Sequence, residues 1–257
     1  MLAKIFGPMR ALGTRWGKAR SSETSATCEP RSIQDQQDEE TIGFVRPYTM
    51  TSLERIRALC SAVRYIEQAQ IEGAVVECGV WRGGSMMAVA RTLTNLGATR
   101  RHLYLFDTFE GMTKPGPRDI ALTGETATCL LEQSERTEDD RVWCYAPIER
   151  VAKALSLTGY PNGLLHLIPG RVEETLATAA PERIALLRLD TDWYESTRQE
   201  MNVLFPRLAR GGVLIIDDYG HWQGAREAVD EYVKTHQLKL LLHPIDYTGR
   251  IAVKAFD

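Results

Sequence analysis

Four aspartates stand in two short groups, and each group directly follows a run of apolar residues that is typical of a buried strand. Asp190-Thr191-Asp192 follows IALLRL, and Asp217-Asp218 follows GGVLII. Residues two apart on an extended strand point to the same side, so Asp190 and Asp192 can face one cleft. Neighbouring strands lie about 5 Å apart. The sequence therefore predicts that the four carboxylates gather at one edge of one sheet.

These carboxylates suggest a metal site, because without a cation they would repel one another and raise one another's pKa. Mg²⁺ prefers oxygen ligands in octahedral geometry and keeps several waters, so its exchangeable positions can hold neighbouring hydroxyls of a substrate. The competing interpretation is that the aspartates cap helices or pair with Arg188 and Arg198. The presence of all four in one cluster favours the metal.

A glycine-rich turn follows an earlier apolar run. It reads ECGVWRGGS, from Glu77 to Ser85. Glycines at a strand-to-helix turn let the backbone approach a ligand closely, and the helix N-terminus can receive a polar or anionic group such as a methionine carboxylate. The dinucleotide fingerprint G-x-G-x-x-G is absent, which disfavours a nicotinamide cofactor. A tight turn without a ligand is the alternative.

An acid also ends the next apolar run, since Asp107 closes HLYLFD. In nucleotide-binding sheets an acid one strand–helix unit after the glycine-rich turn holds a ribose diol by hydrogen bonds. Alone, Asp107 could equally cap the next helix. Together with the glycine-rich turn it favours a cofactor that contains a nucleoside.

The histidines carry a weaker signal. His221 directly follows the Asp217-Asp218 pair and could line the pocket or assist proton transfer. His102 and His166 lie in predicted strands, where packing is the simpler interpretation. The sequence does not decide whether His221 takes part in catalysis.

The elements that must position these residues alternate along the chain. Predicted strands cover 73–80, 102–107, 164–170, 184–190 and 211–218, and predicted helices cover 53–69, 85–96, a segment near 173, 195–209 and 223–234. The tail pairs 238–243 with 250–256 as an antiparallel hairpin. This alternation predicts an α/β fold with a mostly parallel sheet, in which ligands bind beyond the carboxyl ends of the strands.

The N-terminal region differs in composition from the rest of the chain. Residues 21–41 are polar and charged, which predicts a flexible arm over residues 1–43 and one domain over 44–257. The first twenty residues are basic and carry an interrupted apolar stripe. An amphipathic or targeting segment is the alternative to a flexible extension there.

Composition excludes several classes of partner. The formal net charge of −3 and the pI near 6.0 give no reason to expect nucleic acid. No apolar stretch approaches the roughly 20 residues that cross a bilayer. The five cysteines form no C-x-x-C pair, which favours a reducing cytoplasm over a disulfide framework or a zinc site.

The motifs ECGVWRGGS, FDTFEGM, LRLDTDWYEST and GGVLIIDDYG, with the upstream YTMT, resemble the macrocin O-methyltransferase family. Their order over roughly residues 44–257 makes the resemblance specific. It implies a Rossmann-like class I methyltransferase fold with a mostly parallel seven-stranded sheet and a C-terminal antiparallel hairpin. It also implies S-adenosylmethionine- and Mg²⁺-dependent methylation of a sugar hydroxyl on a glycosylated natural product of antibiotic biosynthesis.

The resemblance further implies a role for individual residues. Those expected around S-adenosylmethionine are Thr49, Glu77, Gly79, Ser85 and Asp107, with Gly170, Arg171 and Val172 near the adenine. Asp190, Asp217 and Asp218 would bind Mg²⁺, and Asp192 would be the general base that takes the proton of the acceptor hydroxyl. A homodimer or higher homo-oligomer is expected, with N-terminal segments helping to close the site.

Three alternatives remain open at this point. A metal-dependent O-methyltransferase of a catechol-like or other small diol would use the same aspartates. A nicotinamide-dependent oxidoreductase could use the same sheet, although the missing fingerprint disfavours it. A non-catalytic protein that binds S-adenosylmethionine would have no need of the acidic cluster. The acceptor and its methylated hydroxyl are not identified by the sequence.

Overall fold

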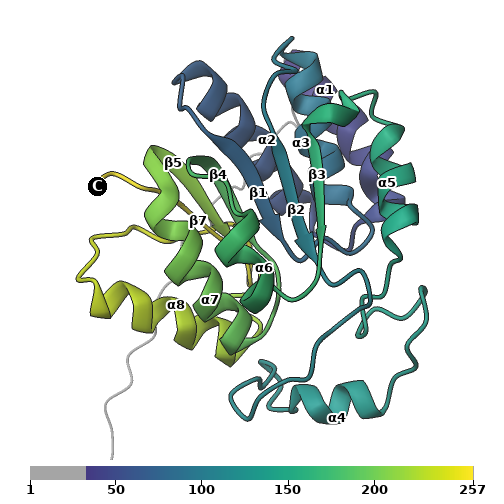
Figure 1. The fold of residues 1–257 in the computed structure, drawn as a ribbon, viewed down its shortest axis with the longest axis vertical. Helices are drawn as coiled ribbons and strands as arrows, with labels where there is room; N and C mark the ends of the chain where they lie inside the picture. Colours follow the sequence, from purple (N-terminus) through teal and green to yellow (C-terminus); the bar gives the residue numbers. More distant parts are fainter. Residues whose placement is uncertain (1–32, 257) are drawn as a thin grey trace, which may run out of the picture.

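A computed structural model describes residues 33–256 of the 257-residue chain. Its seven strands form one sheet in the order β3-β2-β1-β4-β5-β7-β6 (Figure 1). The strands are β1 Ala74–Cys78, β2 Leu103–Asp107, β3 Leu165–Pro169, β4 Ile184–Leu189, β5 Leu208–Ile216, β6 His243–Pro244 and β7 Arg250–Val253. The helices are α1 Ile33–Val45, α2 Leu53–Gln68, α3 Gly84–Asn95, α4 Ala127–Glu132, α5 Ile148–Ser156, α6 Val172–Ala179, α7 Tyr194–Leu204 and α8 Gln223–Thr235.

The expected α/β architecture is confirmed. Strands β3, β2, β1, β4 and β5 pair in parallel, and β7 and β6 complete the sheet as antiparallel strands. The chain runs outward from β1 through β2 to β3 and then crosses back to β4, beside β1. This reversal of strand order opens a crevice beyond the carboxyl ends of β1 and β4, which is where ligands bind in such sheets.

Both faces of the sheet are covered by helices, because the central strands are apolar on both sides. Helices α1, α2, α3 and α5 pack on one face, and α6, α7 and α8 pack on the other (Figure 1). Side chains alternate between the two cores along each strand, as Val213 and Ile215 face the first core while Leu214 and Ile216 face the second. Within residues 33–256, no helix is both long enough and apolar enough to cross a membrane.

Residues 108–147, here called the lobe, lie beyond the carboxyl ends of the strands and contain α4 (Figure 1). The lobe packs through a third apolar cluster, in which Ala127 and Leu131 contact Trp193 and Trp222. The sequence patterns did not predict α4 or α5. Helix α4 spans only six residues, which is too short for a clear helical period.

Helix α1 corrects the expected extent of the flexible arm, because residues 33–43 belong to it; residues 1–32 lie outside the described part. The helix has few apolar residues but buries Thr41, Ile42 and Val45. Its buried Asp38 accepts two hydrogen bonds from Arg64 of α2, at 2.7 and 2.8 Å. An ion pair and a short apolar contact thus order a segment whose composition indicates disorder.

The C-terminal hairpin is present but shorter than expected. Strand β6 has two residues, and residues 238–242 are not in a strand, although Leu238, Leu240 and Leu242 pack against the second core. Asp246, after β6, binds Ser52 and Arg55 at the α2 N-terminus, at 2.7 and 2.9 Å, and so ties the hairpin connection to α2. Strand β5 begins at Leu208 rather than 211, so the helix expected over 195–209 ends earlier, at Leu204.

Candidate active site

A cavity of about 430 Å³ lies at the carboxyl edge of the sheet. Eleven of the twelve residues expected at the site line it: Thr49, Gly79, Ser85, Asp107, Gly170, Arg171, Val172, Asp190, Asp192, Asp217 and Asp218. These residues come from the segment before α2, from the ends of β1, β2, β3, β4 and β5, and from the first turns of α3 and α6. The sheet therefore brings together side chains that are up to 169 positions apart in the sequence, from Thr49 to Asp218.

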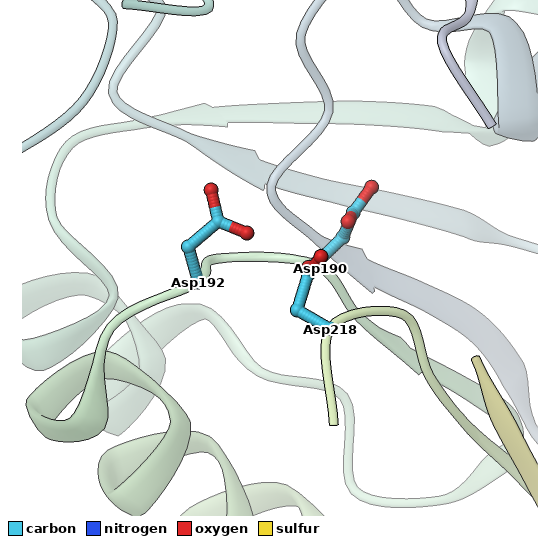
Figure 2. A group of neighbouring side chains, drawn as sticks. All are labelled: Asp190, Asp192 and Asp218. Atoms are coloured by element: carbon cyan, nitrogen blue, oxygen red, sulfur yellow. The ribbon is translucent and has the colours of Figure 1, made fainter. Parts of the chain in front are cut away.

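Three of the aspartates form a compact group (Figure 2). Carboxylate oxygens of Asp190, Asp192 and Asp218 all lie within 4.8 Å of one another. Asp190 and Asp192 follow β4, and Asp218 follows β5, so the pairing of two neighbouring strands creates the group. Asp192 has a φ of +67°, in the left-handed region.

The charge balance of this group is unfavourable without a cation. Burial raises the pKa of Asp192 to about 7, and the neighbouring Asp190 and Asp217 contribute to the increase. Burial likewise holds the pKa of Asp190 and of Asp218 well above the ordinary range, with further increases from adjacent carboxylates. Three ionised carboxylates in this space would oppose one another.

The donor set fits a hard divalent cation. It offers only carboxylate oxygens, which Mg²⁺ prefers. Within residues 33–256, the Oδ2 atom of Asp218 is buried and has no hydrogen-bond partner, and a buried carboxylate oxygen normally has one. A cation at this position would satisfy it.

Asp217 lies apart from this group, although the sequence placed it there. Its Oδ1 accepts from Arg188 at 2.6 Å, and its Oδ2 pairs with Arg55 of α2. Consecutive residues at the end of β5 point to opposite sides, so when Asp218 faces the group its neighbour faces the arginines. The pairing of an aspartate with Arg188, which the sequence left as the competing interpretation, therefore holds for Asp217 and also for Asp190. Arg198 instead pairs with Glu195.

Glu77 does not line the cavity, contrary to its expected place around the cofactor. It is 1% exposed in β1, and its Oε1 accepts from Arg188 at 2.7 Å. Burial raises the pKa of Glu77 to about 7 although Arg188 lowers it. Arg188 also binds Asp190 at 2.6 Å and Thr51 at 3.1 Å, so it connects β1, β4, β5 and the α2 connection beneath the cavity.

Asp107 holds the glycine-rich turn in place. Its Oδ2 accepts from the backbone N–H groups of Val80 and Trp81, at 2.6 and 3.0 Å, and its Oδ1 accepts from that of Phe109 at 2.7 Å. The turn comes close to β4, because a Cβ on Gly79, whose φ is +80°, would overlap the Asp190 carbonyl. Asp107 thus lies at the cavity but already has partners within the chain.

The N-terminus of α3 opens into the cavity beside the YTMT segment. Gly83 precedes the helix with a left-handed φ of +88° and provides no side-chain cap. A Cβ on Gly84 would lie 2.6 Å from the Thr49 Cβ, so the two segments touch. The free N–H groups of this first turn can receive a polar or anionic group.

Several cavity residues were not singled out by the sequence. Arg55, Trp193, Trp222, Tyr247 and lobe residues such as Met112 and Leu130 line it. Trp193 follows the DTD motif directly, and that adjacency was the available signal. His221 also lines the cavity, 3.4 Å from the Tyr247 hydroxyl, and burial and Arg55 lower its pKa.

The expected packing role holds for His166, whose ring stacks on Tyr104, and only in part for the neighbouring His102. Their ring nitrogens Nδ1 and Nε2 lie 2.8 Å apart, and the two rings stack, with His102 exposed at the start of β2. They lie at the opposite ends of β2 and β3 from the cavity.

Comparisons with known proteins agree with this geometry. The model of the macrocin-O-methyltransferase (TylF) family matches residues 12–253. The 8-demethyl-8-(2,3-dimethoxy-α-L-rhamnosyl)-tetracenomycin-C 4'-O-methyltransferase of Streptomyces olivaceus is 33% identical over 202 residues, which cover 79% of this chain and 74% of that protein. The mycinamicin III 3''-O-methyltransferase of Micromonospora griseorubida is 30% identical over 202 residues, 79% of this chain and 76% of that protein.

Solved structures show the same fold. The O-methyltransferase NovP superposes with a TM-score of 0.71 at 26% identity, over 81% of this chain and 83% of that chain. The calicheamicin methyltransferase CalS11 has a TM-score of 0.58 at 17% identity, over 87% and 93% of the two chains, and supports the fold alone. With the family model spanning nearly the whole sequence, the chain belongs to the macrocin O-methyltransferase family and is an O-methyltransferase that uses S-adenosylmethionine as methyl donor.

Proposed function

We propose that this enzyme methylates a sugar hydroxyl of a glycosylated natural product, with Mg²⁺ bound beside the acceptor. The observation that carries the proposal is the shared cavity: the group of Asp190, Asp192 and Asp218 opens into the same space as the glycine-rich turn. The activities of the two relatives above, which act on a rhamnosylated tetracenomycin and on mycinamicin III, support a glycosylated acceptor.

The cofactor side of the cavity is proposed at the ends of β1, β2 and β3. There the first turn of α3 offers N–H groups to the methionine carboxylate, and Thr49 and Ser85 lie beside it. Asp107 would accept from the ribose hydroxyls while it continues to hold the turn. The segment 170–172 would contact the adenine. Glu77 acts on this site only through Arg188, because it does not reach the cavity.

The metal side is proposed at the ends of β4 and β5. Asp190 and Asp218 would hold Mg²⁺, which when bound supplies Lewis acidity that lowers the pKa of the acceptor hydroxyl. Asp192 faces the same position and would accept the proton of that hydroxyl. A ligand role for Asp217 also remains a proposal, and it requires a lone pair that its two arginine partners leave free.

The methyl group of a sulfonium is already electrophilic, so it needs little activation. The main contribution of the chain is therefore to align the methyl group with the acceptor hydroxyl. The cavity holds donor and acceptor from opposite sides, and such alignment is worth several kcal/mol of a barrier. Trp193 and Trp222, with the lobe residues, cover the acceptor side and reduce access of water.

The first experiment is isothermal titration of the protein with S-adenosylmethionine, with and without Mg²⁺, and with a nicotinamide cofactor as control. We expect binding of S-adenosylmethionine alone and none of the nicotinamide. A second experiment identifies the class of acceptor. The protein is incubated with S-adenosylmethionine and Mg²⁺ together with glycosylated polyketides or small catechols, and methylation of each compound is measured. Methylation of catechols only would contradict the sugar assignment.

Metal dependence is tested separately with Asp218→Asn. The substitution removes one anionic ligand but keeps the side-chain volume, so Mg²⁺ affinity should fall by at least about tenfold. Undiminished Mg²⁺ binding would contradict the metal assignment.

A homo-oligomeric state and a cytoplasmic location are further proposals from the resemblance and the cysteine pattern. Light scattering of the purified protein tests the oligomeric state.

A further inference from the structure

The segment that carries Asp190 and Asp192 is held by contacts from distant parts of the chain. The left-handed backbone of Asp192 is uncommon for a residue other than glycine, and such conformations persist where the surroundings determine them. The Thr191 hydroxyl donates to the buried Glu200 at 2.9 Å, which anchors the segment from the side of α7. A second anchor acts just after Asp192.

That second anchor is Asp119 of the lobe, which is 2% exposed. Its Oδ1 accepts from the backbone N–H of Tyr194, the first residue of α7, at 2.8 Å. Its Oδ2 accepts from the backbone N–H of Gly116 at 2.7 Å. One carboxylate therefore joins the start of α7, two residues after Asp192, to the lobe.

Asp119 also lies against the start of α8. A Cβ on Gly224, the second residue of α8, would overlap the Asp119 Oδ1, so this glycine leaves room for the carboxylate. Two helix N-termini thus converge on one carboxylate; burial raises the pKa of Asp119, and the hydrogen bonds from Tyr194 and Gly116 oppose this increase. Neither helix has a side-chain cap from its own N-cap residue.

The lobe is attached to the same region by other bonds. The indole N–H of Trp193 donates to the Thr113 carbonyl at 3.1 Å, and the N–H of Gln223 donates to the Ile120 carbonyl at 2.9 Å. Of these three links between the lobe and the starts of α7 and α8, only the one through Asp119 bonds the backbone of α7. Movement of the lobe would therefore be transmitted to the segment that carries Asp192.

We propose that Asp119 is a positioning residue that fixes the start of α7 and thereby the orientation of Asp192, so that docking of the lobe orders the carboxylate group that takes Mg²⁺. The inference rests on the metal role in the proposed function. It assigns to a lobe residue, more than 70 positions before Asp192 in the sequence, a part in ordering the site without contact to the substrate.

The test combines two measurements on the full chain, neither of which needs the acceptor. Mg²⁺ is titrated calorimetrically in the presence of S-adenosylmethionine, and hydrogen exchange is followed for residues 190–196. The variants are Asp119→Ala and Asp119→Asn. The matched control is Asp140→Ala, because Asp140 accepts from two backbone N–H groups within the lobe, both at 2.8 Å, but does not contact α7.

For Asp119→Ala we expect Mg²⁺ binding to weaken by about tenfold or more, with faster exchange at 190–196. Asp119→Asn should recover most of the affinity, since its amide oxygen can accept from Tyr194. Asp140→Ala should lower the Tm while leaving Mg²⁺ affinity and this exchange unchanged.

Unchanged exchange and unchanged Mg²⁺ affinity in Asp119→Ala would overturn the positioning role, even if the Tm falls. If that variant does not fold, Gly224→Ala serves instead: its added Cβ shifts the Asp119 carboxylate without removing it. Mg²⁺ affinity and hydrogen exchange at 190–196 then test the positioning role in the same way. Wild-type protein that fails to bind Mg²⁺ would instead contradict the proposed function, and the hydrogen-exchange comparison would still decide the positioning role.

Discussion

At the scale of single residues, the site is a group of carboxylates whose charge depends on what binds between them. Asp192 has a pKa of about 7 in the folded chain because it is buried beside other carboxylates. In the unfolded chain an aspartate has a pKa near 3.9. The folded metal-free protein therefore binds more protons than the unfolded chain between these two pH values, and its stability falls as pH rises through this window.

This linkage predicts a pH-dependent effect of Mg²⁺ on thermal stability. Asp192 is mainly deprotonated at pH 8, so there the cation does not have to displace its proton; at pH 6 Asp192 is mainly protonated and the cation must displace that proton. We expect saturating Mg²⁺ to raise the Tm at pH 8 by at least about 2 °C more than at pH 6. Thermal scans at both pH values, with Asp218→Asn as control, measure this difference. Equal shifts at the two pH values would contradict it.

Asp192→Asn tests the proposed base. The amide cannot take up a proton, so turnover should fall by about 10²–10⁴-fold. Affinity for S-adenosylmethionine should remain at the wild-type value, because the proposed cofactor side lies at other strand ends. Turnover assays and calorimetry separate these effects. Glu195→Gln is the control. Glu195 is exposed in the first turn of α7, close to Asp192 in sequence, and pairs only with Arg198 among the described residues. Normal turnover of Asp192→Asn would exclude it as the base.

At the scale of elements, the proposed cofactor side depends on how closely α3 and the YTMT segment approach. Gly84 makes that approach possible, because a Cβ there would lie 2.6 Å from both the Thr49 Cβ and the Tyr48 carbonyl oxygen. The sequence pattern indicates that the glycines of this turn let the backbone approach a ligand. Gly84 serves at least equally for the approach of one backbone segment to another.

Gly84→Ala should therefore weaken S-adenosylmethionine binding. Displacement of Thr49 from the helix N-terminus should raise the Kd about fivefold or more, equivalent to about 1 kcal/mol. Gly43→Ala is the matched control: Gly43 lies within α1 with nothing near its Cβ position, so the change should stabilise the helix by about 0.5–1 kcal/mol. Calorimetric titration measures the Kd of both variants. An unaltered Kd for Gly84→Ala would show that the segment adapts at no cost to binding.

At the scale of the whole molecule, α1 extends the first core beyond the part that the sequence indicated as ordered. Its attachment depends on the buried pair of Asp38 and Arg64 rather than on a large apolar face. The side chains of this pair are 11% and 15% exposed, whereas those of the neighbouring pair of Glu39 and Arg57 are 45% and 46% exposed. The two pairs thus offer a direct comparison of buried and exposed charge on one helix.

Asp38→Ala should lower the free energy of unfolding by about 1.5–3 kcal/mol, because it leaves Arg64 without its carboxylate. Glu39→Ala should cost less than about 1 kcal/mol, since exposed pairs are screened by water. Denaturant unfolding measures both values, and Mg²⁺ affinity should be unchanged in both variants. Equal costs would indicate that α1 docking does not depend on the buried pair.

The sequence alone determined which residues end the strands, and with them most of the cavity. Apolar runs closed by Asp107, Asp190 and Asp218 follow from the local pattern, because burial on both faces requires apolar residues and a parallel sheet brings the carboxyl ends of its strands to one edge. Asp190 and Asp192 lie close together as expected, but both follow the end of β4, and Asp192 has a left-handed φ of +67° rather than the extended backbone that the strand period assumes. The sequence placed Asp217 in the same group as Asp218, whereas in the structure Asp217 pairs with Arg55 and Arg188.

Only the tertiary structure decided which charges pair with which. Asp217 is bound by Arg55 and Arg188, and Glu77 by Arg188, because packing brings α2 and β1 beside β4 and β5. Glu200 of α7 binds Thr191 of the DTD motif, and Asp119 of the lobe binds Tyr194, two residues after it. The physical reason is common to all of these contacts: they join residues that lie far from one another in sequence or on different faces of an element, and no local period encodes such a pairing. The order of residues 33–43 was likewise decided by the partner that α2 supplies.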